Sequence, residues 1–322
     1  MAETPDPEEQ ICTDFDATLA RLQGEGARLD VIWPADAPHS AILTHGGRRI
    51  RLTSQPEAPP PGALPAFAPA FVLTRAGTEA GAGRAGMTYR DLIPGRLGGH
   101  SIASHITIPA GGPVADWVHY HRVGFQLIVV RRGRVRLVYQ DQGPPFVMHP
   151  GDMVLQPPGL RHRVLEASAG LEVVEISCPA VHETFADHDL ELPNGAARLG
   201  RTYGGQHFLH HVATTAAWRP WHGGEAQATA LRAATGGLAA ARIVRPGAGA
   251  AITVPPHDGA LVFGFVLEGS ARLDFAGDPH ELGPADAFVI PPDRDWGLNA
   301  MSADFRLLHV TTASETAENH QR

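Results

Sequence analysis

The chain of 322 residues contains no lysine and only two cysteines, Cys12 and Cys178. Two cysteines so far apart argue against a disulfide framework and against a cysteine-based zinc site. The basic residues are all arginines, scattered along a chain whose formal net charge is −8, so nothing indicates nucleic-acid binding. Because no apolar run approaches the roughly 20 residues that span a bilayer, we expect no membrane partner either.

The first ten residues, MAETPDPEEQ, lack the basic and apolar regions of an export signal, so we expect a cytoplasmic protein. Residues 14–29 carry apolar side chains near helical spacing, which predicts a short N-terminal helix that Asp14 could cap. Residues 41–54 predict a hairpin around Gly46-Gly47, and the proline-rich stretch 55–70 predicts an irregular arm.

Glycine and proline are abundant, with 36 and 28 residues, and they separate short runs of β-forming residues from about residue 98 onward. Runs such as FQLIVV (125–130), RVRLVY (134–139) and LEVVEISC (171–178) lie between turn sequences at regular spacing. This pattern predicts an all-β protein built as antiparallel sandwiches or barrels.

The second half of the chain repeats the first. VVRRGRVRLVY (129–139) aligns with FVLEGSARLDF (265–275), and GDMVLQPPGLRH (151–162) aligns with ADAFVIPPDRDW (285–296). An internal duplication therefore predicts two domains of the same fold. The predicted division is as follows: residues 1–97, helix, hairpin and proline-rich arm packing on the barrels; 98–185, first barrel; 186–235, linker and start of the second domain; 236–314, second barrel; 315–322, tail.

Histidine is also abundant, with 18 residues, and three histidines of the first repeat have a particular spacing. His119 and His121 share one face of a strand because side chains alternate, and Gln126 lies on the next strand. The Pro-Pro-Gly turn then delivers His162 at the head of a later strand. If the strand that carries Gln126 doubles back beside the first, Gln126 can approach the two imidazoles, and His162 is a fourth candidate for the same group.

This pattern, with Gly133, Gly151, Pro157 and Gly159, resembles the two sequence motifs of the cupin superfamily, and the duplication resembles a bicupin. The resemblance implies two jelly-roll β-barrels and one divalent metal inside the mouth of the first, bound by His119, His121, Gln126 and His162. We also expect a homo-oligomer, with a dimer as the first expectation. Two positions depart from the family pattern. Gln126 replaces the usual acidic ligand, and Glu166 replaces an asparagine. A neutral ligand set leaves the charge of the metal uncompensated, which favours an anionic substrate.

The second repeat keeps one of the four ligand positions. His257 matches His121, whereas Val262 stands for Gln126 and Trp296 for His162. A single imidazole does not hold a divalent metal against water, so the second barrel is predicted to be degenerate and metal-free.

Bicupins with one degenerate half resemble ring-cleaving and diketone- or flavonol-cleaving dioxygenases. This resemblance implies an oxygenase with one metal ion per chain, and Fe(II) is the metal that we expect. The substrate would be a small organic anion with an enolisable or aromatic core. The alternative is a non-redox isomerase, lyase, decarboxylase or cyclase using Zn, Mn or Ni, with Tyr139, Glu166 or Glu175 as a proton carrier. A third alternative is a non-catalytic bicupin that binds a small molecule. His105 is a further candidate for the pocket lining.

Overall fold

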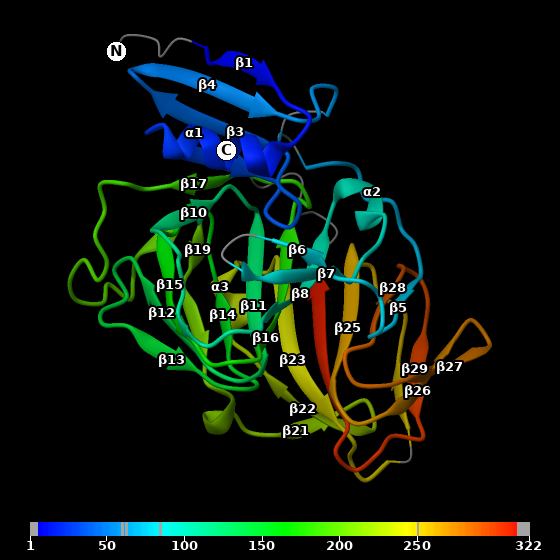
Figure 1. Cartoon of the computed structure of the whole chain (residues 1–322). Coiled ribbons are helices and arrows are strands. Elements are labelled where there is room, and N and C mark those ends of the chain that lie inside the picture. The colour runs from blue at the N-terminus through cyan, green and yellow to red at the C-terminus, as the bar shows by residue number, and fades with distance from the viewer. Residues whose placement is uncertain (1–5, 59–60, 62–63, 84–85, 250, 314–322) are drawn as a thin grey trace.

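Two β-barrels lie side by side in the computed structural model, and an N-terminal β-α element covers one end of the first barrel (Figure 1). The structure describes residues 6–58, 61, 64–83, 86–249 and 251–313, so the predicted tail 315–322 lies outside the described residues. The predicted fold class, all-β with duplicated cupin-like barrels and a short N-terminal helix, is confirmed. No helix among the described residues has the length and apolarity to cross a bilayer.

The first barrel is formed by two facing sheets. Its seven-stranded sheet has the spatial order β20 (Leu209–His211), β14 (Met153–Leu155), β11 (Phe125–Arg132), β16 (Leu171–Cys178), β8 (Ile102–Ile108), β7 (Thr88–Asp91) and β6 (Gly81–Ala82). The barrel strands of the opposite sheet are β17 (Thr184–Ala186), β10 (His119–His121), β15 (His162–Ala167), β12 (Val135–Tyr139), β13 (Phe146–Met148) and β9 (Gly112–Pro113).

The N-terminal element extends this second sheet beyond β17. Its strands are β2 (Arg28–Trp33), β3 (Ser40–His45), β4 (Arg48–Thr53) and β1 (Glu8–Ile11), and β3 and β4 form a hairpin. Helix α1 (Phe15–Gly24) begins at Asp14, whose carboxylate accepts a hydrogen bond from the Ala17 amide at 2.9 Å. The helix therefore starts where the sequence predicts and ends at the first of its two glycines.

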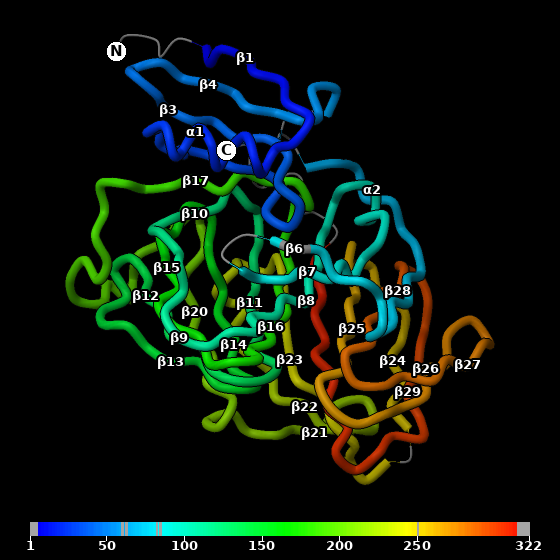
Figure 2. The backbone as a smooth tube through the Cα atoms, in the orientation of Figure 1, coloured from blue at the N-terminus to red at the C-terminus, as the bar shows by residue number. Residues whose placement is uncertain are grey.

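The second barrel repeats this arrangement. One sheet has the order β21 (Arg219–Trp221), β22 (Gly224–Ala228), β23 (Ala239–Arg245), β30 (Arg306–Thr312), β25 (Leu261–Glu268), β28 (Ala287–Ile290) and β5 (Val72–Thr74). The other has the order β24 (Ile252–Val254), β29 (Trp296–Asn299), β26 (Ala271–Phe275) and β27 (Asp278–Leu282). Strand β5 belongs to the arm that follows the N-terminal element, and Figure 2 traces this arm to the edge of the second barrel. Between β5 and β8 lies α2 (Arg96–Gly99).

The duplication extends to the tight turn between β11 and β12 in the first barrel and between β25 and β26 in the second. Gly133 and Gly269 have φ angles of +80° and +69°, in the left-handed region that favours glycine. A Cβ at either position would lie within 2.5 Å of a serine hydroxyl, Ser168 or Ser302. Each of these hydroxyls accepts a hydrogen bond of 2.9 Å from the backbone amide that follows the glycine.

The two seven-stranded sheets pack against each other and bury the largest apolar cluster between the barrels. Strand β11 contributes Phe125, Leu127 and Val129 to this cluster, while Val130, on its other face, packs inside the first barrel. Both faces of β11 are covered, which explains its continuous apolar run. The same alternation places Gln126 and Ile128 on the face toward the interior of the first barrel.

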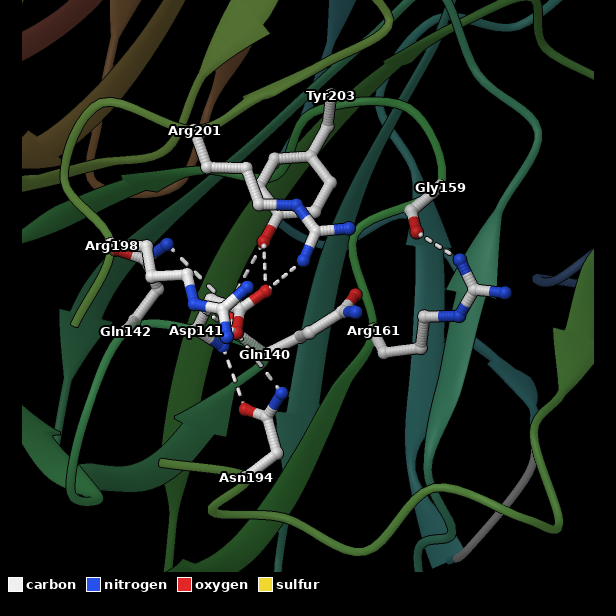
Figure 3. A network of polar contacts seen from close by, with 9 residues as sticks. All are labelled: Gln140, Asp141, Gln142, Gly159, Arg161, Asn194, Arg198, Arg201 and Tyr203. Atoms are coloured by element: carbon white, nitrogen blue, oxygen red, sulfur yellow. Dashed lines mark hydrogen bonds and ion pairs between the residues drawn. The ribbon is translucent and has the colours of Figure 1, made fainter. Parts of the chain in front are cut away.

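The segment between the barrels, residues 186–235, contains β20, β21 and β22 together with β18 (Thr202–Tyr203), β19 (Gln206–His207), the 3-10 turn η2 (Ala213–Thr215) and α3 (Leu231–Ala234). A polar network joins its first part to the first barrel (Figure 3). The buried Asp141 carboxylate accepts a hydrogen bond from Asn194 at 3.1 Å and forms ion pairs with Arg198 and Arg201. These contacts hold the connecting segment against the hairpin that follows β12.

Candidate metal centre

Three histidines meet inside the first barrel. His119 and His121 lie on the same face of β10, and His119 is the register partner of His162 on the adjacent strand β15. All three side chains are buried, and one ring nitrogen from each lies within 4.8 Å of the others. In the part of the chain that the structure describes, this is the only group of three or more His, Cys, Asp or Glu residues that could hold a metal ion.

Hydrogen bonds fix the orientation of each ring. Nδ1 of His119 donates to the Trp117 carbonyl at 2.8 Å, and Nδ1 of His162 donates to the Leu160 carbonyl at 3.0 Å. Nδ1 of His121 lies 3.0 Å from the Thr184 hydroxyl. With Nδ1 of each ring engaged by these contacts, Nε2 is the atom that would bind a metal.

Gln126 is the fourth predicted ligand, and it is 1% exposed on β11. Its Nε2 donates a hydrogen bond to Glu175 Oε1 at 3.1 Å, whereas its Oε1 is buried without a hydrogen-bond partner among the described residues. A buried amide oxygen without a partner is costly, and an amide oxygen is also a competent ligand for a divalent cation. The residues present therefore fit a metal, and direct ligation by Gln126 stays a prediction.

A cavity of about 690 Å³, including its part open to solvent, adjoins the three histidines. Its wall is mainly apolar and comes from six strands: Met87, Tyr89, Ile106, Ile108, Ile128, Val135, Leu137, Val164, Leu171 and Val173. Ala35, from the loop after β2, adds the N-terminal element to this wall. The other polar groups are Gln156 and Glu175, and no arginine is among the described lining residues.

The three proposed proton carriers lie in different environments. Glu175 lines the cavity and holds Gln126. Tyr139 is fully buried beside His162, with the ring centroids 5.6 Å apart, and its hydroxyl accepts a hydrogen bond from Gln156 at 3.0 Å. Burial raises the pKa of Tyr139, so its phenol stays protonated. Glu166 lines a separate surface depression with Arg134 and Arg136.

Two residues beside the histidines were missed by sequence reasoning. His182 is buried with its ring edge-on to His121 at 5.6 Å, and its Nδ1 donates to the Pro179 carbonyl at 3.0 Å. Asp116 is buried with Oδ1 3.5 Å from Nδ1 of His119, and its other oxygen accepts the Val164 amide at 2.9 Å. Both lie on irregular segments outside strand periodicity, so the sequence carried no signal for either.

His105 is absent from the described lining of this cavity. Its Nε2 lies 2.8 Å from Glu172 Oε2, and its Nδ1 lies 3.2 Å from the Arg90 guanidinium. Arg131 also pairs with Glu172 and donates to the Leu267 carbonyl of the second barrel. His105 therefore belongs to a polar network at the junction of the two barrels.

The corresponding interior of the second barrel has a different composition. Trp296 is the first residue of β29, just as His162 is the first residue of β15. Trp296 pairs with Phe275 at the end of β26, and His162 pairs with Tyr139 at the end of β12. The indole of Trp296 is buried, and Val262 packs in the same apolar cluster. His257 lies outside the strands with Nε2 donating to the Ile290 carbonyl at 3.2 Å. No group of metal-binding side chains occurs there among the described residues.

Comparison with known proteins supports this architecture. Residues 104–177 match the cupin domain family, whereas a search of curated proteins finds no match. An oxalate decarboxylase from Bacillus subtilis is similar with a TM-score of 0.56 and 12% identity, over 79% of this chain and 79% of that chain. Protein Ylba from E. coli has a TM-score of 0.54 and 12% identity, over 79% of this chain and 94% of that chain.

A variant of salicylate 1,2-dioxygenase from Pseudoaminobacter salicylatoxidans has a TM-score of 0.50 and 17% identity, over 66% of this chain and 70% of that chain. At these identities the similarities establish the fold. Residues 104–177 therefore form a cupin domain, and with a second barrel of the same build the chain has the fold of a bicupin.

Proposed function

We propose that this bicupin is a metal-dependent oxygenase, with Fe(II) bound at His119, His121, His162 and Gln126. The observation that carries the proposal is the convergence of three buried imidazoles on the lining of a mainly apolar cavity. Bound Fe(II) would supply redox chemistry toward O2 and open positions for an anionic substrate.

The protein residues would hold and shield the substrate. The isoleucine, leucine and valine side chains of the wall would pack against an apolar or aromatic body and exclude water. Because no arginine is among the described lining residues, the negative charge of a substrate would be balanced at the metal. The substrate class that fits is therefore a small organic anion with an aromatic or enolisable core. The relative described as a salicylate 1,2-dioxygenase supports this class by analogy of fold.

Oxygen consumption tests this proposal. Full-length protein would be purified without oxygen, loaded with Fe(II), and mixed with 2-hydroxybenzoates, catechols and 1,3-diketones in an oxygen electrode. We expect substrate-dependent O2 uptake with at least one probe, and its loss in His121→Ala. His257→Ala, which changes a histidine of the second barrel, is the matched control and should keep full activity. Absence of O2 uptake in a protein that contains a full equivalent of Fe(II) would contradict an oxygenase.

A second candidate is a non-redox lyase, isomerase or cyclase, and the position of Glu175 favours it. This carboxylate lines the cavity and lies within hydrogen-bonding distance of Gln126, so it could accept a proton from a substrate bound at the centre. The same probes incubated with Zn-, Mn- or Ni-loaded protein under nitrogen would separate the two candidates. Turnover or exchange of a substrate proton with deuterium oxide, without O2, would identify the non-redox reaction.

A further inference from the structure

The interior of the second barrel contains an arginine–histidine pair, at the positions where the first barrel has Ser104 and Glu175. Arg242 on β23 and His309 on β30 are register partners, so their side chains lie on the same side of the sheet. Their strand neighbours Ala241 and Val310 belong to the apolar cluster between the barrels. Because side chains alternate along a strand, Arg242 and His309 point into the second barrel.

Several hydrogen-bonding atoms of this pair and of Trp296 lack partners. Nε of Arg242, both ring nitrogens of His309 and Nε1 of Trp296 are buried without a hydrogen-bond partner among the described residues. Buried donors are almost always satisfied in native proteins, and leaving one unmade costs about 1–3 kcal/mol. Four such atoms from three side chains, three donors and one imidazole acceptor, therefore indicate that a ligand or ordered water supplies their partners here.

Aromatic contacts hold these side chains together. The His309 ring lies between two indoles, with centroid distances of 5.2 Å to Trp221 and 5.7 Å to Trp296. The Arg242 guanidinium lies 5.1 Å from the centre of the Trp221 ring. The donors are thus fixed in place before any ligand arrives, which lowers the entropic cost of binding.

The charge of this cluster is uncompensated. Arg242 forms no ion pair with a carboxylate among the described residues, although its Nε is buried. Burial, followed by the charges of Arg242, His222 and His257, lowers the pKa of His309 to about 3, so this imidazole is neutral with one N–H to donate. Arg242 is half-buried with its Nε in the interior, and an anion would balance its charge and supply the missing hydrogen bonds.

We propose that the second barrel binds one small oxyanion, a carboxylate or an inorganic equivalent, through Arg242, His309 and Trp296. The site uses side chains of the barrel that has lost its metal ligands, and it is independent of the oxygenase proposed for the first barrel. The alternative is that ordered water, and no anion, satisfies these atoms, and the experiment must distinguish the two.

Isothermal titration of the full-length protein with sodium acetate tests the proposal, with sodium nitrate as the inorganic arm and sodium chloride as the ionic-strength control. We expect saturable binding of one equivalent in the wild type and in His121→Ala, which removes a metal ligand of the first barrel. Binding of acetate but not nitrate identifies a carboxylate site, whereas binding of both identifies a general oxyanion site. Arg242→Gln should weaken binding at least about tenfold because it removes the cation.

Arg272→Gln is the matched control, since Arg272 lies on β26 with its side chain 44% exposed, and it should bind as the wild type does. Trp296→Phe keeps an aromatic ring and removes one donor, so it should weaken binding severalfold even if Arg242→Gln fails to fold. Absence of saturable binding of either anion to the wild type would overturn the proposal in favour of ordered water. Equal affinity in Trp296→Phe and the wild type, or loss of binding in His121→Ala, would overturn the proposed location.

Discussion

His119 and His162 face each other across the paired strands β10 and β15, and the centroids of their rings lie 4.2 Å apart. The Trp117 and Leu160 carbonyls hold the two rings, each from a residue two positions earlier in the chain. The pair is therefore oriented by local backbone on both strands, and only the strand pairing brings the two halves together. This arrangement makes the metal centre sensitive to single substitutions.

His162→Ala should empty the metal centre. Loss of one of three imidazoles leaves too few ligands to compete with water, so metal content should fall from about one ion per chain to less than about 0.2. Elemental analysis after anaerobic purification measures this. His257→Ala should retain the full content, and an unchanged content in His162→Ala would disprove the three-histidine centre.

Glu175→Gln distinguishes two roles of Glu175, as a proton carrier and as the hydrogen-bond acceptor that orients Gln126. The amide can still accept the hydrogen bond from Gln126, so metal content should be unchanged, whereas proton transfer would be lost. If the reaction needs a proton carrier, kcat should fall about 10²- to 10⁴-fold. Glu175→Ala should also weaken metal binding, by about 10- to 100-fold, because it frees the Gln126 amide. Glu166→Gln, which changes a carboxylate outside the cavity, is the control for both measurements.

The network at the barrel junction should make stability depend on pH. Burial, followed by the charge of Arg90, lowers the pKa of His105 to about 4, although Glu172 acts in the opposite direction and Arg131 in the same direction as Arg90. Between pH 6.5 and 4 the unfolded chain therefore binds a proton that the folded chain excludes, so the free energy of unfolding falls as pH falls through this window.

His105→Gln isolates this contribution. Between pH 7 and pH 4 the free energy of unfolding should fall in both proteins. The fall should be smaller in His105→Gln than in the wild type, by up to about 3 kcal/mol. Urea unfolding at several pH values, followed by circular dichroism, gives the difference. Parallel curves for the two proteins would show that protonation of His105 does not limit stability.

Asp141 should be important for stability because it anchors the segment between the barrels (Figure 3). Its φ angle of +56° is tolerated by Asp and Asn better than by Ala, and its carboxylate binds Asn194 and Arg201. Asp141→Ala should lower the free energy of unfolding by about 2–3 kcal/mol, and Asp141→Asn by less. Arg198→Ala is the control, since that side chain is 70% exposed and its loss should cost less than about 1 kcal/mol.

Much of the fold followed from local pattern. The run FQLIVV predicted a strand at 125–130, and β11 spans Phe125–Arg132. LEVVEISC predicted 171–178, and β16 has those bounds. Such runs are reliable because both faces of these strands are covered, so apolar residues predominate in them. His105 shows the limit of this reasoning, since it was a candidate for the pocket lining but its side chain lies in the polar network at the barrel junction.

The sequence by itself determined the β character, the duplication and the shared strand face of His119 and His121, because side-chain alternation and turn residues act over a few positions. The pairing of β10 with β15 then brings His162 to them. Tertiary structure alone decided that Glu175 holds Gln126 and that Arg242 lies beside His309. These contacts join strands distant along the chain. Periodicity fixes the face on which a side chain lies, whereas strand pairing fixes what it meets.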